Sequence, residues 1–252
     1  MIFKMYLEKI FRRLSPRATV LIYHRVAKVR EDPHLLSVSP KNFEAQIKYL
    51  SQNFHLVGLA DISKKHNLIG HNKENIAITF DDGYQDNYYN ALPILKKYSA
   101  PATIFVATNM INSNNPYYWE EQTRPVDQGK CMTVYQLKQL DRESLITIGA
   151  HTRSHPQLIK LSRSRQLYEI RGSKKDLEKI LNHPVESFSY PFGGYSDISY
   201  QTINIVKQSG FKYAAVNWSG NMTLFENIYT IPRIIIRNWD LKTFVNYLHR
   251  KV

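Results

Sequence analysis

Thr79-Phe80-Asp81-Asp82-Gly83 is the stretch from which the fold of this chain can be worked out. Its two adjacent carboxylates follow an apolar run, Ile76-Ala77-Ile78, and precede a glycine, so they stand where a buried strand ends. An acidic pair before a glycine is, by itself, more often a turn and a helix cap than a catalytic site. A partner motif elsewhere in the chain has to decide between the two.

A second motif, Gly149-Ala150-His151-Thr152-Arg153-Ser154-His155-Pro156, places two imidazoles four residues apart, again after an apolar run. Pro156 and the preceding strand favour a strand end that leads into a loop over a helix. Loop hydrogen bonding is the plain alternative for such a histidine pair. One carboxylate and two imidazoles are a ligand set that favours Zn²⁺, with Co²⁺, Ni²⁺, Fe²⁺ or Mn²⁺ as other occupants.

Composition bounds the class of protein. The chain has 252 residues, of which 43% are hydrophobic and 22% charged, which is typical of a globular protein and of the size of one α/β barrel. A net charge of +13 attracts anionic partners. No recognised nucleic-acid motif accompanies that charge, so we expect a solvated basic surface and no nucleic-acid partner. Cys131 is the only cysteine, which excludes an intramolecular disulfide and a thiolate zinc cage.

Residues 1–17 predict a basic amphipathic helix that precedes the domain at 18–252. Their apolar residues never run long enough for a signal-peptide core or a membrane span. The helix either packs on the domain or lies on an anionic membrane surface. These features predict a protein that is cytoplasmic or peripheral at the inner membrane face.

Apolar strand patterns alternate with helical patterns along the rest of the chain, and no linker divides them. This alternation predicts an α/β fold, a single distorted or incomplete (β/α) barrel with seven or eight strands. Asp86 is expected to cap a helix over residues 87–98. Residues 109–132 predict a long loop whose aromatic side chains either stack on sugar rings or pack on one another. The expected strands cover residues 18–23, 55–59, 75–80, 101–108, 144–150, 185–190, 211–216 and 227–236.

Chemistry in such barrels collects at the carboxyl ends of the strands. The unusual polar side chains of this chain follow strands at those ends: His24, Asp81, Asp82, His151 and His155. A metal there would lower the pKa of water and polarise a carbonyl, and one of the two carboxylates would be free to act as a base.

Together the two motifs resemble the first two signature motifs of polysaccharide deacetylases with the NodB homology domain, carbohydrate esterase family 4. The resemblance covers roughly residues 18–240. It implies that Asp81 is the general base and that Asp82, His151 and His155 bind the metal. The implied reaction is hydrolysis of an N-acetyl group on an amino sugar, with the oxyanion held by the metal and a backbone N–H.

The third motif of that family, Arg-x-Pro-aromatic-Gly, is similar to Ser189-Tyr190-Pro191-Phe192-Gly193. The resemblance implies that the backbone N–H of Phe192 helps the oxyanion. Pro191 and Gly193 can fix the turn, and with Tyr195 they are the candidate substrate-binding residues.

Ser189 stands where the family has an arginine that orients the base. Arg233, in a late strand, is our candidate for the missing charge partner, and an ordinary surface arginine is the alternative. His24 is the candidate general acid, because relatives with Tyr-His near the start place it by the active site, and a structural histidine is the alternative. His249 lies in a helix, and the histidines to which we assign no chemistry are His34, His55, His66, His71 and His183.

The leading hypothesis is therefore a metal-dependent hydrolase that removes N-acetyl groups from an amino sugar in a polysaccharide, an oligosaccharide or a lipid-linked glycan. A deformylase of a lipid-linked formamido sugar is the alternative within the same chemistry. A nucleic-acid-binding protein with an inactive barrel is the alternative from another class.

Overall fold

The computed structural model describes residues 18–64, 73–223 and 226–251. Its centre is a sheet in the order β10-β1-β5-β6-β7-β8-β9, with β4 paired to β5, and all of these pairings are parallel. The strands of this sheet are β1 (Ala18–Tyr23), β4 (His55–Leu56), β5 (Asn75–Phe80), β6 (Ala102–Val106), β7 (Ile146–Ala150), β8 (Ser187–Ser189), β9 (Tyr213–Ala215) and β10 (Ile234–Ile235). The expectation of a distorted or incomplete (β/α) barrel is confirmed.

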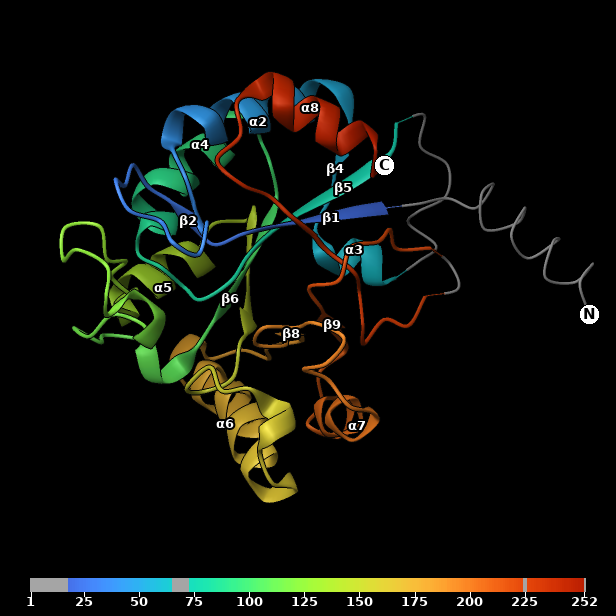
Figure 1. The fold of residues 1–252 in the computed structure, drawn as a ribbon. Coiled ribbons are helices and arrows are strands. Elements are labelled where there is room, and N and C mark those ends of the chain that lie inside the picture. The colour runs from blue at the N-terminus through green and yellow to red at the C-terminus, as the bar shows by residue number, and fades with distance from the viewer. Residues whose placement is uncertain (1–17, 65–72, 224–225, 252) are drawn as a thin grey trace, which may run out of the picture.

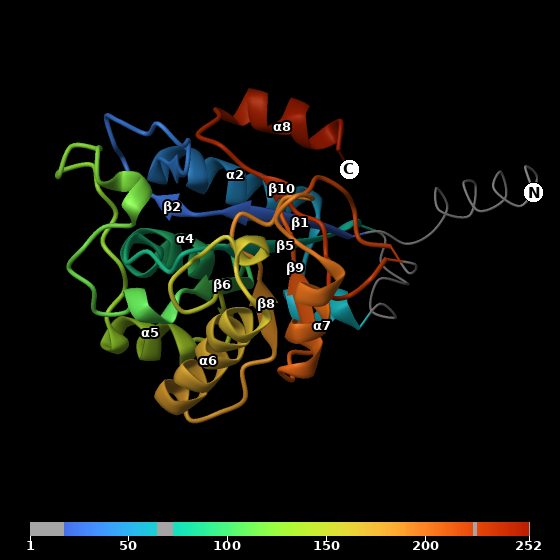
Figure 2. The same ribbon diagram turned by 60° about the horizontal axis from the view of Figure 1, so that its bottom comes forward.

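Helices lie around the outside of the curved sheet (Figure 1). The longer ones are α2 (Pro40–Asn53), α3 (Leu59–Ser63), α4 (Leu92–Lys97), α5 (Val134–Asp141), α6 (Arg163–Leu181), α7 (Tyr200–Gln208) and α8 (Leu241–His249). Short turns of helix are η2 (Asn87–Ala91), η3 (Thr108–Met110), η4 (Tyr118–Glu120) and η5 (Leu158–Lys160), and a separate pair of strands is β2 (Arg25–Val26) with β3 (Ser37–Val38). In both ribbon views α8 and α2 lie on one side of the molecule and α6 and α7 on the other (Figure 2).

Among the described residues, no helix combines the length and the apolar character needed to cross a membrane. The amphipathic helix expected over residues 1–17 lies outside the described residues.

Local signals place most helix starts. Ser39 caps α2 by accepting from the N–H of Asn42, and Thr133 forms a reciprocal capping box with Gln136 at the start of α5. The expected cap at Asp86 is wrong. Its carboxylate makes no capping bond and instead accepts from Arg25 Nε at 3.2 Å and from the N–H of Val26 at 3.0 Å.

The expected helix over residues 87–98 is divided into the π-helical turn η2 and the α-helix α4. Pro93 explains the division, because it has no N–H to donate to the preceding turn. The expected strand over residues 227–236 is also shorter, since only Ile234–Ile235 forms β10. Residues 227–230 turn, with the N–H of Thr230 bonded to the carbonyl of Asn227, and Pro232 again lacks a donor.

Residues 231–236 nevertheless join the two edges of the sheet. On one side, the N–H of Ile231 donates to the carbonyl of Ala214, and the N–H of Val216 donates to the carbonyl of Ile231. On the other side, Leu21 of β1 pairs with Ile234 of β10. This segment therefore brings Arg233 to the place where the first and last strands of the sheet approach each other.

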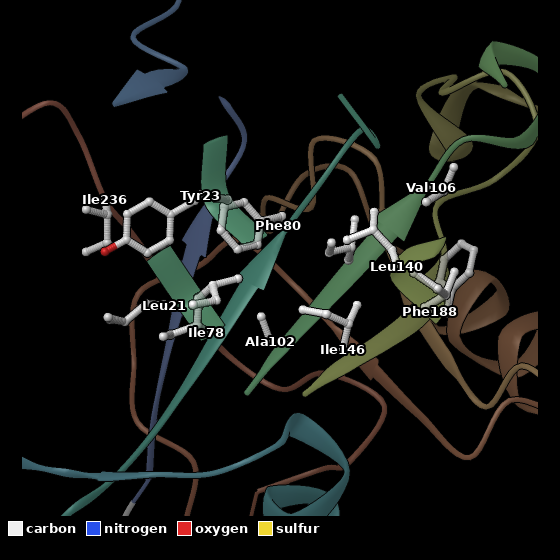
Figure 3. Packing of buried hydrophobic residues seen from close by; sticks show 14 of the residues in the cluster. Leu21, Tyr23, Ile78, Phe80, Ala102, Val106, Leu140, Ile146, Phe188 and Ile236 are labelled. Atoms are coloured by element: carbon white, nitrogen blue, oxygen red, sulfur yellow. The ribbon is translucent and has the colours of Figure 1, made fainter. Parts of the chain in front are cut away.

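The core has two faces because side chains alternate along each strand. Ile76, Ile78 and Phe80 of β5 belong to the larger cluster, which packs against the helices. Phe80 packs there against Tyr23, at a ring-centroid distance of 5.6 Å (Figure 3). It also packs against Phe43, at 5.8 Å. The opposite face carries a smaller cluster made mainly by Ala18, Val20, Ala77, Phe105, Tyr213 and Ala215.

The smaller cluster is filled so tightly that a glycine is required in β7. A methyl group at Gly149 would lie 2.5 Å from the ring of Phe105 and 2.5 Å from Ser187 Oγ. We predict that Gly149→Ala lowers the free energy of unfolding by about 1–3 kcal/mol through overpacking. The midpoint and slope of urea unfolding measure this change.

Gly220→Ala is the control for that variant, because its added methyl would meet only the side chain of Pro232, at 3.3 Å. It is expected to lose less stability than Gly149→Ala. Equal midpoints for the two variants would contradict the tight packing inferred at Gly149.

Candidate active site

Side-chain alternation brings the polar residues to one end of the barrel. Ala77 and Thr79 alternate with the outer residues of β5, and the next residue in that series is Asp81. Thr147 and Gly149 lead in the same way to His151 beyond β7, and Val20 and Ile22 lead to His24 beyond β1. The carboxyl ends of the parallel strands thus direct these side chains into one mouth.

Asp81 and Arg233 form a buried ion pair there. Arg233 Nη1 donates to Asp81 Oδ1 and Arg233 Nη2 to Asp81 Oδ2, both at 2.7 Å, and the two residues are 0% and 1% exposed. Ser189 Oγ donates to Asp81 Oδ2 at 3.0 Å and accepts from Arg233 Nη2 at 2.8 Å. Burial alone would raise the pKa of Asp81, but the charges of Arg233 and His151 hold that pKa well below its usual range.

Arg233 makes hydrogen bonds through each of its three guanidinium nitrogens. Its Nε donates to the carbonyl of Val216 at 3.0 Å, Nη1 to Thr79 Oγ1 at 3.2 Å, and Nη2 to Asn217 Oδ1 at 2.6 Å. Arg233, the predicted charge partner, therefore lies in contact with Asp81, and because it is 0% exposed the surface-arginine alternative is wrong. Ser189, at the position of the family arginine, joins the two halves of the pair.

Asp82, His151 and His155 are the group that could hold a metal ion, since their ligand atoms all lie within 4.8 Å of one another. Asp82 Oδ1 is 3.5 Å from His151 Nε2 and 3.4 Å from His155 Nε2. His151 Nδ1 lies 2.8 Å from the carbonyl oxygen of Ser189. That oxygen can only accept, so Nδ1 carries a proton, and Nε2 is the ring nitrogen that faces Asp82.

The donors fit a divalent cation. Asp82 Oδ1 is buried and has no hydrogen-bond partner in the described structure, which is costly for a carboxylate unless a cation binds it. Burial raises the pKa of Asp82, but His151 and His155 lower it below its ordinary value, so the carboxylate is ionised. Burial lowers the pKa of His155 to about 4, which keeps that imidazole neutral as a metal ligand must be.

Several residues around the possible metal site have a left-handed backbone conformation. Of the eight non-glycine residues with positive φ in the described ranges, four lie at the site: Asp82 (72°), Thr152 (64°), His155 (56°) and Phe192 (61°). Such conformations cost of order 1–3 kcal/mol each and persist only where the surroundings hold them. The backbone of the site is therefore held by its neighbours against its own preference.

The loop between the two histidines is held by Thr152 and Glu169. Thr152 Oγ1 donates to the carbonyl of His151 and accepts from the N–H of His155. Glu169, on α6, accepts from the N–H groups of Arg153 and Ser154 at 2.9 Å each and from Ser154 Oγ at 2.8 Å. Glu169 is buried, so one carboxylate from a neighbouring helix fixes the loop that carries both imidazoles.

An open cavity of about 340 Å³ lies over this group. Trp119 and Phe192 flank the ring of His155, with ring centroids 4.7 and 5.1 Å from it. Tyr117 stacks on Trp119 at 4.3 Å, and its hydroxyl donates to the carbonyl of Asp82 at 2.6 Å. Part of the aromatic loop over residues 109–132 is thus self-packed, while Tyr118 and Trp119 line the cavity.

His24 also lines the cavity, and burial lowers its pKa although Asp82 and Asp81 act in the opposite direction. Pro191, Gly193 and Tyr195 lie outside the cavity lining in the described structure, whereas Phe192 belongs to it. Gly193 has a φ of 63° and forms the turn behind Phe192. Tyr195 is 75% exposed.

Sequence reasoning missed several residues that line the cavity: His34, Leu36, Asn217, Ile235 and Arg237. Asn217 could have been found, because it continues the inner-facing series of Tyr213 and Ala215 beyond β9. His34 had been assigned no chemistry. His34 reaches the cavity through the loop between β2 and β3, where its Nε2 lies 3.1 Å from the carbonyl oxygen of Trp119. The periodicity of the sequence cannot predict a contact made by a loop.

The chain is similar to known proteins along most of its length. The family model described as polysaccharide deacetylase matches residues 69–214. Staphylococcus aureus poly-beta-1,6-N-acetyl-D-glucosamine N-deacetylase is 28% identical over 240 residues, which are 87% of this chain and 78% of that protein. The Bacillus subtilis protein YxkH, which carries the name of a polysaccharide deacetylase, is 27% identical over 221 residues, 85% of this chain and 70% of that protein.

Among solved structures, the Streptococcus pyogenes deacetylase PplD in complex with acetate superposes with a TM-score of 0.77 at 24% identity. The match covers 94% of this chain and 99% of that one. This likeness supports the fold alone.

Glu169 offers a test of how the histidine loop is held. Glu169→Ala removes the acceptor of two backbone N–H groups and one hydroxyl, and we predict a loss of about 2 kcal/mol in the free energy of unfolding. Glu169→Gln keeps one carbonyl oxygen as an acceptor and is expected to lose less. Thermal or urea unfolding measures both variants, and an alanine variant as stable as the wild type would contradict the role given to Glu169.

Proposed function

The chain belongs to the polysaccharide deacetylase family, whose members are hydrolases of amide bonds, and from this premise we propose that it is a metal-dependent enzyme that removes N-acetyl groups from a glycan. The proposed substrate is a polymer or oligomer of N-acetylglucosamine, by analogy with the poly-beta-1,6-N-acetyl-D-glucosamine N-deacetylase of Staphylococcus aureus. The observation that carries the proposal is the buried group of Asp82, His151 and His155 beside an ionised Asp81.

Asp82, His151 and His155 would hold the metal, and Zn²⁺ is the proposed ion because two imidazoles and one carboxylate suit it best, with Co²⁺, Ni²⁺, Fe²⁺ or Mn²⁺ as alternatives. When bound, the ion would polarise the acetyl carbonyl and acidify water. All other groups that we propose to take part in the reaction are side chains and backbone groups of this chain.

Asp81 is the proposed general base. Arg233 keeps it ionised and fixes both of its oxygens, so the carboxylate is aimed at the cavity without freedom to turn. The backbone N–H of Phe192 is proposed to donate to the oxyanion as the tetrahedral intermediate forms. His24, which also lines the cavity, is proposed to donate a proton to the leaving nitrogen, because a histidine with a lowered pKa is a strong acid once protonated.

The alternatives gain no support. No comparison favours a lipid-linked formamido sugar, and none concerns a nucleic acid. Contact with an anionic membrane through residues 1–17 stays a prediction, because those residues lie outside the described ranges.

Metal content tests the ligand assignment. Wild-type protein equilibrated with Zn²⁺ is expected to bind about one ion per chain, as one three-ligand site implies. Asp82→Ala and His151→Ala each remove a ligand and should weaken binding by more than about a hundredfold. Equilibrium dialysis with elemental analysis measures both.

His183→Ala serves as the control in that experiment, since His183 is an exposed histidine paired with Asp141. It should bind Zn²⁺ like the wild type. Undiminished metal in both ligand variants would overturn the assignment.

Acetate release tests the base. Asp81→Asn keeps an oxygen that accepts from Arg233 but removes the basic carboxylate, so we predict that metal is retained while the rate of acetate release from N-acetylglucosamine oligomers falls by about 10²–10⁴-fold. An enzymatic acetate assay follows the rate at saturating metal. Wild-type turnover in this variant would exclude Asp81 as the base.

A further inference from the structure

A stacked aromatic pair follows two of the residues that line the cavity, Phe192 and Asn217. The rings of Tyr195 and Trp218 lie 4.3 Å apart at an interplanar angle of 7°. Tyr195 is 75% exposed, whereas Trp218 is partly buried and packs against the larger core cluster. Trp218 therefore supports one face of the tyrosine ring, and the rest of that ring is turned to solvent.

This pair adjoins the cavity through both of its segments. Phe192, which lines the cavity, is three residues before Tyr195, and Asn217, which also lines it, directly precedes Trp218. The two segments are bonded to each other, because the N–H of Asn217 donates to the carbonyl of Gly193 at 2.8 Å and Asn217 Nδ2 donates to the carbonyl of Phe192 at 2.7 Å. The stacked pair is thus a continuation of the cavity rim.

The same segments are fixed in place. The N–H of Gly194 donates to Asp197 Oδ2 at 3.0 Å, and the N–H of Asp197 donates back to the carbonyl of Gly194 at 3.0 Å. The N–H of Arg233 donates to the carbonyl of Trp218 at 3.2 Å. The platform is therefore tied to the arginine that holds Asp81, and a ligand stacking on it would order few additional side chains.

We propose that Tyr195, supported by Trp218, is a stacking subsite for the sugar unit next to the one whose acetyl group enters the catalytic cavity. A pyranose ring presents an apolar face of C–H groups that matches a flat, rigid aromatic ring, while the tyrosine hydroxyl remains available to the sugar hydroxyls. Its occupant is the neighbouring unit of the same glycan chain, because the platform is continuous with the rim. This inference rests on the proposed deacetylase function and adds selection of oligomers over single sugars.

Exposure alone does not single out Tyr195. Tyr200, at the start of α7, is 80% exposed, yet within the described residues no aromatic ring stacks on it and it does not line the cavity. A solvent-facing tyrosine of this kind is the ordinary case. Tyr200 therefore provides a matched control, five residues along the chain.

Oligomer selectivity tests the subsite. The metal-loaded wild type and the variants Tyr195→Ala, Tyr195→Phe and Tyr200→Ala would be compared on the β-1,6-linked tetramer of N-acetylglucosamine and on the monosaccharide. Tyr195→Ala is expected to lower the ratio of kcat/KM for tetramer over monosaccharide about tenfold, mainly through the KM for the tetramer, because one stacking contact is lost. Tyr195→Phe keeps the ring and should retain most of the ratio, and Tyr200→Ala should leave it unchanged.

Binding of the tetramer to the metal-free proteins, followed by calorimetry, separates failure of the subsite from failure of the proposed function. If the wild type releases acetate and Tyr195→Ala has an unchanged ratio and unchanged binding, the subsite is overturned while the deacetylase function stands. If no substrate releases acetate but Tyr195→Ala binds the tetramer about tenfold more weakly than Tyr200→Ala does, the reaction is wrong and the sugar platform stands. Equal binding by all variants without acetate release overturns both.

Discussion

The buried pair of Asp81 and Arg233 is the interaction on which the site depends. Taking a carboxylate and a guanidinium out of water costs several kcal/mol for each ion, and only good geometry with further hydrogen bonds offsets that cost. The bidentate contact supplies the geometry, and the carbonyl of Val216 with the side chains of Ser189, Thr79 and Asn217 provides the further hydrogen bonds. A carboxylate at the mouth of an apolar barrel can thereby stay ionised, as a general base must.

That pair also links the site to closure of the barrel. Residues 231–236 bond to β9 through Ile231 and pair with β1 through Ile234, so Arg233, which lies between these two residues, is held from both edges of the sheet. Pro232 cannot donate, which limits regular pairing just before Arg233 and leaves β10 only two residues long. The segment that brings the two edges of the sheet together is thus the same one that positions the Arg233 guanidinium beside Asp81. A change that loosens this segment would therefore affect both the closure of the barrel and the ion pair.

Much of the fold and the centre of the site could be predicted from the sequence, because they depend on apolar residues that recur every two residues in strands and every 3.6 residues in helices. Alternation along the strands at residues 75–80 and 146–150 is enough to send Asp81 and His151 to the same mouth. The absence of the family arginine at Ser189 pointed to Arg233 as the replacement. The features that could not be predicted from the sequence depend on long-range contacts. Asp86 is a residue type that often caps helices, but its carboxylate binds the buried Arg25 instead. Trp119 contacts His155 because Tyr117 stacks on the other side of the Trp119 ring. Local patterns cannot rank such competitors.

The backbone conformation at Asp82 gives the two adjacent aspartates different surroundings. In a continuing strand, Asp81 and Asp82 would face opposite sides of the sheet. The φ of 72° at Asp82 ends the strand and turns its carboxylate toward the same mouth, a conformation that costs free energy and is held in part by the bond from Tyr117 to the carbonyl of Asp82. Arg233 then neutralises Asp81, whereas the buried Oδ1 of Asp82 faces two imidazoles and no hydrogen-bond donor in the described structure. The negative charge left uncompensated is that of Asp82, which is why we propose the cation for the second aspartate and the proton transfer for the first.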